Sequence, residues 1–64
     1  MVKPGRYRHY KGGTYVVLFT AKSADNDQPY VVYMNEVHGT YYVRSLADFQ
    51  SKVGGLARFI LLEE

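Results

Sequence analysis

Residues 5–19 read Gly5-Arg6-Tyr7-Arg8-His9-Tyr10-Lys11-Gly12-Gly13-Thr14-Tyr15-Val16-Val17-Leu18-Phe19. This segment gives the clearest indication of secondary structure in the chain. Aromatic and cationic side chains interleave before the glycine pair, and a run of β-branched and aromatic residues follows it, which is typical of strands. Both glycines can adopt positive φ, as a tight hairpin turn requires. The segment predicts two strands, about residues 6–10 and 14–21, joined by a glycine turn.

Three further strands are expected at residues 30–35, 40–44 and 57–62. The polar segment 22–29 ends in Pro29, which cannot donate a hydrogen bond to a sheet, so it predicts an exposed loop. Residues 36–39 contain a glycine and predict the next turn.

A short helix is expected between the last two strands because the apolar period changes there. Leu46, Phe49 and Val53 form one stripe at helical spacing. Ser45, with an acidic residue three positions later, predicts the N-cap, and Gly54-Gly55 predicts the C-terminal end.

Five short strands with one helix before the last indicate a mainly β domain. The order fits a small SH3-like five-stranded barrel, which also removes free sheet edges, or an open, bent antiparallel sheet with the helix packed across it. Strict alternation in the second strand would put Tyr15, Val17, Phe19 and Ala21 on one face. We expect the core to be formed by Val17, Phe19, Val32, Val43, Leu46, Phe49, Val53, Phe59 and Leu61.

The length of 64 residues predicts one domain spanning residues 1–64, with Met1 to Pro4 as a flexible lead-in. Such a chain buries only about 60% of its unfolded surface. It has no cysteine, so disulfides cannot stabilise it. No apolar run has the length of a signal peptide or a membrane span, so we expect a soluble, cytoplasmic protein without membrane contact.

Charge is distributed unevenly along the chain. Residues 1–22 hold five Lys or Arg residues and no acid, whereas the remainder holds three bases and six acids, for a formal net charge of +2. This asymmetry indicates one basic face and an anionic partner.

Catalytic and metal-binding patterns are absent from the sequence. His9 has no acid within sequence reach, and His38 is expected to be solvated in a turn. Ser23 and Ser51 do not stand in a glycine elbow, and the Gly12-Gly13 pair is followed by a strand rather than by a phosphate-binding helix. We therefore expect a non-enzymatic protein with no cofactor and no metal.

A face rich in Tyr and Arg is the candidate binding site. Aromatic rings can stack on bases, and guanidinium groups can pair with phosphates. The same tyrosines are also good half-buried strand residues, so the set can be read as core. The function expected first is nucleic-acid binding; the alternatives are a peptide-binding, protein-binding or oligomerising module and a binder of a small anionic ligand such as a nucleotide. The candidate ligand-binding residues are Tyr7, Arg8, His9, Tyr10, Lys11, Tyr33, Tyr42 and Arg44.

The chain resembles DUF1653, a family of small bacterial and phage domains of unknown function. The resemblance covers about residues 5–59 and implies one small β-rich domain without an established activity. Three departures stand out: Ser23-Ala24-Asp25 replaces a His-Ser-Glu, Tyr42 replaces a Trp, and Ser45 replaces a Pro. A shared site that used the family's His and Trp would be altered in this chain. The matching residues are Gly5, Tyr7, His9-Tyr10-Lys11-Gly12, Tyr15, Ala21, Pro29, Val31-Val32-Tyr33, Tyr42-Val43-Arg44, Phe49 and Arg58-Phe59.

Overall fold

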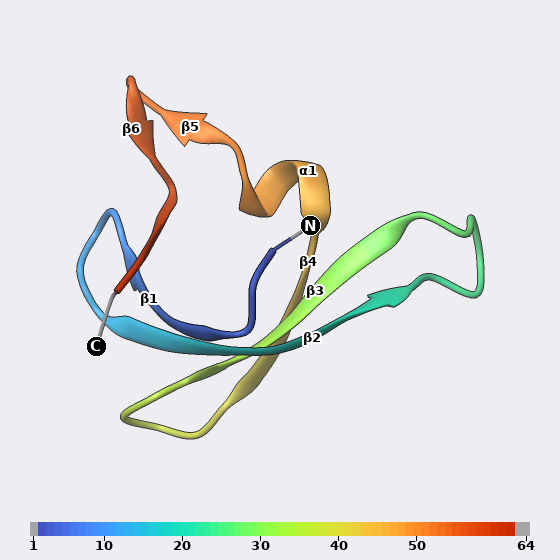
Figure 1. Cartoon of the computed structure of the whole chain (residues 1–64), viewed down its shortest axis with the longest axis horizontal. Coiled ribbons are helices and arrows are strands. Elements are labelled where there is room, and N and C mark those ends of the chain that lie inside the picture. Colours follow the sequence, from blue (N-terminus) through green and yellow to red (C-terminus); the bar gives the residue numbers. More distant parts are fainter. Residues whose placement is uncertain (1, 63–64) are drawn as a thin grey trace.

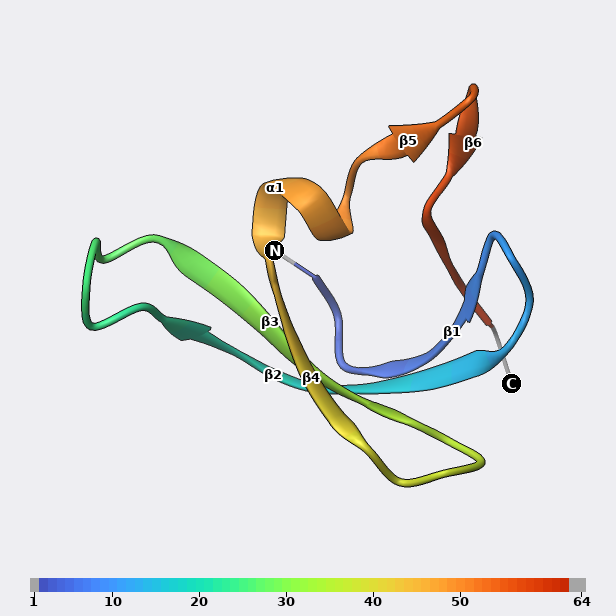
Figure 2. The same cartoon turned by 180° about the vertical axis from the view of Figure 1, so that it is seen from behind.

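The sheet contains five antiparallel strands in the order β4-β3-β2-β1-β7, and β5 and β6 form a separate two-stranded hairpin. The computed structural model describes residues 2–62. Both views show the sheet strongly bent, with α1 and the β5–β6 hairpin on the same side of it (Figures 1 and 2). The elements are β1 (Gly5–His9), β2 (Thr14–Lys22), β3 (Pro29–Asn35), β4 (Tyr41–Ser45), α1 (Leu46–Phe49), β5 (Lys52–Val53), β6 (Leu56–Ala57) and β7 (Phe59–Leu61).

The described residues form no closed barrel. Strands β4 and β7 are the two edges of the sheet and each pairs with one neighbour only, β4 with β3 and β7 with β1. The SH3-like barrel is therefore not confirmed. The structure matches the other expected arrangement, an open, bent sheet with α1 packed against β3 and β4.

A β-bulge in β2 decides which side chains face the core. The register with β3 shifts between Val17 and Phe19, so Leu18 is an extra residue and the alternation of faces moves by one position. Val17 faces the concave side and is 2% exposed, whereas Phe19 faces the convex side and is 55% exposed. The prediction that Phe19 lies in the core is wrong. Val32 and Val43 lie beside it on the convex face and are also outside the core.

The core lies between the concave face of the sheet and α1. Phe49 and Phe59 stack with ring centroids 4.1 Å apart, and Tyr7 meets Phe49 edge-on at 5.5 Å. Burial of Val17 and Phe49 is thereby confirmed, and Leu46, Phe59 and Leu61 pack against the core as expected. The buried residues of the described part are Val2, Tyr7, Val17, Val31, Tyr33 and Phe49.

The helix is shorter than expected. Its N-cap is confirmed, because the Ser45 Oγ accepts the Asp48 N–H at 3.2 Å, but the helix ends at Phe49. Val53 lies in β5 and pairs with Leu56, so it belongs to a hairpin instead of the helix stripe.

Two of the hairpin connections contain a glycine pair. Gly12 and Gly13 have φ of 97° and 84° between β1 and β2, which confirms the predicted glycine turn. Gly54 and Gly55, with φ of 57° and 86°, connect β5 to β6. Because Val53 pairs with Leu56, Gly54 and Gly55 are the two residues of a hairpin turn, and both have positive φ, whereas a helix C-cap uses only one such residue. The expectation that Gly54-Gly55 ends a helix is therefore wrong.

Both chain ends extend beyond the described residues. Of the expected lead-in, Met1 lies outside them, Val2 is buried at 8% exposure, and the Lys3 carbonyl accepts the Tyr7 hydroxyl at 2.7 Å. Residues 63–64 also lie outside. Within residues 2–62, none of the helices has the length and apolar character needed to span a membrane.

Candidate functional site

A cavity of about 160 Å³ lies on the concave side of the sheet. All five strands of the main sheet contribute one or two side chains to it. Bending brings the far strands within ring contact, since the centroids of Tyr33 in β3 and Phe59 in β7 are 5.5 Å apart. The lining residues are His9, Tyr15, Tyr33, Tyr42, Arg44 and Phe59.

Aromatic rings form most of the cavity wall. Tyr33 and Tyr42 stack with centroids 5.7 Å apart and an interplanar angle of 29°, and Tyr15 meets Tyr33 edge-on at 5.6 Å. Tyr33 is 5% exposed, whereas Tyr42 is 44% exposed. Tyr33 is therefore the floor of the cavity, and Tyr42 is the ring that remains accessible.

Arg44 is held at this cavity by two acceptors. Its Nε donates to the Tyr33 hydroxyl at 3.3 Å, and its Nη1 donates to the Asp48 carboxylate at 2.7 Å. These bonds, with that to Tyr33 the stronger influence, raise the pKa of Arg44. The guanidinium is a fixed positive charge beside the rings.

His9 lines the same cavity as Arg44. Its Nδ1 accepts the Lys11 N–H at 3.2 Å, so the proton of the neutral ring is on Nε2. Burial lowers the pKa of His9, and the nearby charges of Arg44, Arg58 and Lys11 lower it further. The lowered pKa favours the neutral imidazole, which can donate a hydrogen bond through Nε2–H.

A second cavity of about 360 Å³ shares His9 with the first. Here the Tyr10 ring has the Lys11 Nζ 5.8 Å from its centroid and the Arg58 guanidinium carbon at 6.0 Å, both within cation–π range. We call the two cavities together the aromatic-basic groove. The second cavity is lined by Arg8, His9, Tyr10, Lys11, Gly12, Leu56, Ala57 and Ile60.

Seven of the eight predicted site residues line this groove. His9, Tyr33, Tyr42 and Arg44 share the first cavity, and Arg8, Tyr10 and Lys11 join His9 in the second. The exception is Tyr7.

Tyr7 is 7% exposed and packs in the core, where burial raises its pKa. It lines a different cavity, beside Val2 and Phe49. Its inward position follows from its register opposite Tyr15, next to α1.

The predicted site lacks two residues that line the groove, Tyr15 and Phe59, and a third, Arg58, that contacts the ring of the groove residue Tyr10. Tyr15 was recognisable, because it lies on the same face of β2 as the apolar Val17, two positions away. Phe59 was expected only in the core. Its second role as a groove wall depends on contact between β7 and β3, which are far apart in the sequence.

The groove can accept a planar ring against Tyr42 and an anionic group near Lys11, Arg44 and Arg58. Among residues 2–62, no group of three His, Asp or Glu side chains is placed to hold a metal ion.

Comparison with known proteins gives a consistent picture. The sequence model of DUF1653, a protein of unknown function, matches residues 5–59. The crystal structure of a DUF1653 protein from Bordetella bronchiseptica is similar, with a TM-score of 0.86 and 31% sequence identity over 95% of this chain and 87% of that chain. Comparison with curated proteins gives no match. With its fold, its motif at residues 9–12 and these two matches, the chain belongs to the DUF1653 family.

Proposed function

We propose that this protein is a non-enzymatic binding module whose aromatic-basic groove takes single-stranded nucleic acid. The observation that carries the proposal is a cavity that holds the partly exposed Tyr42 ring beside the Arg44 guanidinium and shares His9 with a second cavity lined by Arg8 and Lys11. Proteins that bind single strands combine basic grooves with rings on which bases stack.

The dimensions of the groove favour one nucleotide at a time. A volume of about 160 Å³ is below the usual range of about 300–1,000 Å³ for pockets that take whole ligands, and it suits a single base ring against Tyr42. The adjoining cavity would hold the attached phosphate near Arg8 and Lys11. His9 lines both cavities, so its side chain can serve as a donor to either group.

Single strands suit this groove better than a duplex. A base stacked inside a duplex cannot present its face to Tyr42, whereas an unpaired base can be splayed out onto a ring. Since ring stacking does not depend on the identity of the base, we expect little sequence preference.

Fluorescence anisotropy with a labelled single-stranded oligothymidylate, at low and at moderate salt, tests the proposal. Tyr42→Ala should weaken binding by about 1–3 kcal/mol, the usual contribution of one stacked base. Tyr41→Ala is the matched control, because Tyr41 is the adjacent residue, faces the convex side and is 68% exposed.

Free nucleotides distinguish the related candidate, a site for a small anionic ligand. Binding of a nucleoside monophosphate without binding of oligonucleotides would assign the groove to that ligand. The absence of oligonucleotide binding at low salt and micromolar protein would contradict the nucleic-acid proposal.

A further inference from the structure

Strand β4 is an edge with one side left unpaired among the described residues. The Asn35 N–H donates to the Thr40 carbonyl at 2.9 Å, and bonded pairs recur at every second residue of an antiparallel ladder. The N–H and C=O groups of Tyr41 and Val43 therefore point away from β3. No Lys or Pro within β4 blocks this edge against another strand.

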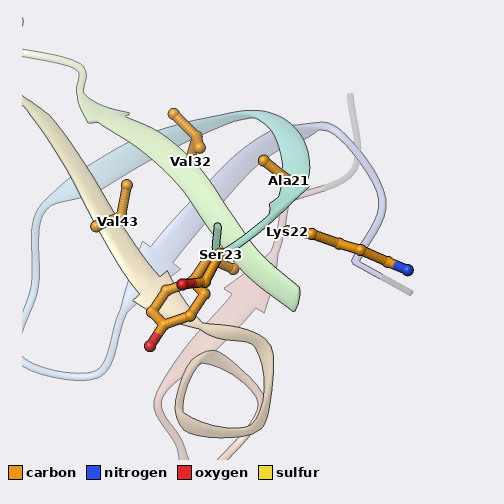
Figure 3. A pocket seen from close by; sticks show the side chains of 6 residues that line it. Ala21, Lys22, Ser23, Val32 and Val43 are labelled. Carbon is orange, nitrogen blue, oxygen red and sulfur yellow. The ribbon is translucent and has the colours of Figure 1, made fainter. Parts of the chain in front are cut away.

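An apolar row on the convex face ends at the same edge. Phe19, Val32 and Val43 lie side by side across β2, β3 and β4, and Phe19 and Val43 are 55% and 66% exposed. Val32 and Val43 border a hollow of about 260 Å³ that Tyr30 also lines, while Lys22 extends away from the two valines (Figure 3).

We propose that β4 pairs antiparallel with β4 of a second copy of this chain, with Val43 opposite Val43. Centring the two-fold axis on this residue pairs all five residues of β4 and uses the outward N–H and C=O groups of Val43. The apolar row then runs without interruption from Phe19 of one copy to Phe19 of the other.

In this register the side chains of one β4 strand complement those of the other. Arg44 lies opposite Tyr42 of the second copy, so a cation faces an aromatic ring instead of a like charge. Tyr41 lies opposite Ser45 of the second copy, whose small side chain leaves room for the ring beside Tyr30 and the hollow. This match between unlike residues favours a second copy over an unrelated strand as the occupant.

The pairing also changes the aromatic-basic groove. Tyr42 and Arg44 lie on the concave face of β4, so both come to the seam between the copies. Each groove would then border Tyr42 and Arg44 of the second copy, and the two grooves would adjoin.

Cysteine cross-linking tests the register directly, because the natural chain has no cysteine. In a bonded antiparallel pair the Cα atoms are about 5.5 Å apart, within disulfide range, so Val43→Cys should give a covalent dimer under mild oxidation. Tyr41→Cys is the matched control: two such residues would be four positions out of register, roughly 13 Å apart, and should not cross-link.

Sedimentation velocity over a range of concentrations measures the association itself. We expect a dimer for the parent, monomer for Val43→Lys, and dimer for Ile60→Lys, a control at a 54% exposed apolar residue on the opposite edge strand. Circular dichroism checks that both variants fold. A parent that stays monomeric, a dimer unaffected by Val43→Lys, or equal cross-linking at residues 41 and 43 would overturn the proposal.

Discussion

For a single residue, its position in the fold decides how much it contributes to stability, as Phe49 and Phe19 show. Phe49 is 3% exposed and stacks on Phe59, whereas Phe19 is 55% exposed on the convex face. Phe49→Ala should lower the free energy of unfolding by about 3–5 kcal/mol, most of what a domain of this size has. Phe19→Ala is the control, with a loss below about 1 kcal/mol. Thermal melting followed by circular dichroism distinguishes them, and equal melting temperatures for parent and Phe49→Ala would place Phe49 at the surface.

His9 predicts a pH dependence of stability. Burial lowers its pKa in the folded protein, with Arg44, Arg58 and Lys11 adding to the effect, while the unfolded chain titrates near about 6.5. Below that value the unfolded chain takes up a proton that the folded protein resists. Stability is therefore full above about pH 6.5 and decreases as pH falls through the lower pKa of the folded state.

Urea unfolding at a series of pH values measures this effect. His9→Asn removes the titrating group and keeps a side-chain acceptor for the Lys11 N–H, so the decrease below about pH 6.5 should become smaller. His38→Asn, in the exposed turn after β3, controls for the loss of a histidine. A parent with constant stability between about pH 7.5 and about pH 5 would show that His9 is not in this environment.

The turn between β5 and β6 gives a prediction at the scale of an element. Gly54 and Gly55 have φ of 57° and 86°, and a Cβ at either would meet no atom within 4 Å, so backbone conformation alone limits substitution. Gly54→Asn should be tolerated because Asn-Gly favours this turn type. Gly55→Val should cost about 1–2 kcal/mol or more, since a β-branched residue resists positive φ. Denaturant unfolding compares the two, and an unaffected Gly55→Val would contradict the turn geometry.

At the scale of the whole molecule, the charges near the groove come from distant parts of the chain. Lys11 belongs to the acid-free segment 1–22, whereas Arg44 and Arg58 join it only through the bend of the sheet. About three or four phosphate contacts are available, so log affinity for single strands should fall with log salt at a slope of roughly −2 to −3.

Replacing each of two lysines by alanine tests whether Lys11 contributes to this salt dependence. Lys11→Ala should make it shallower by somewhat less than one unit, while Lys22→Ala, a charge-matched change at the end of β2, should not. Tyr10→Ala should weaken binding at every salt concentration, because stacking is not screened. Anisotropy over a salt series measures all three effects. Equal slopes for the two lysine variants would show that Lys11 does not contact the phosphates of the bound strand.

Features that depend on neighbouring residues can be predicted from the amino-acid sequence. Alternating β-branched and aromatic residues predict the five strands of the main sheet, the pair Gly12-Gly13 predicts a turn, and Ser45 predicts a helix N-cap. Backbone dihedral preferences and local hydrogen bonds encode these features, so reading them requires no knowledge of pairing. Seven of the eight predicted site residues also reach the groove, because most of them lie on the first hairpin or on the inward face of β3 and β4.

Which faces are buried, and whether the sheet closes, depends on long-range contacts. The bulge at Leu18 depends on the register of β2 against β3, and it moves Phe19 from the expected core to the convex face. Tyr7 is buried because α1 and the N-terminal residues cover it, contacts that no local pattern contains. Within residues 2–62 the sheet stays open because β4 and β7 each pair with one strand, a result of long-range pairing that alternation along a strand does not encode.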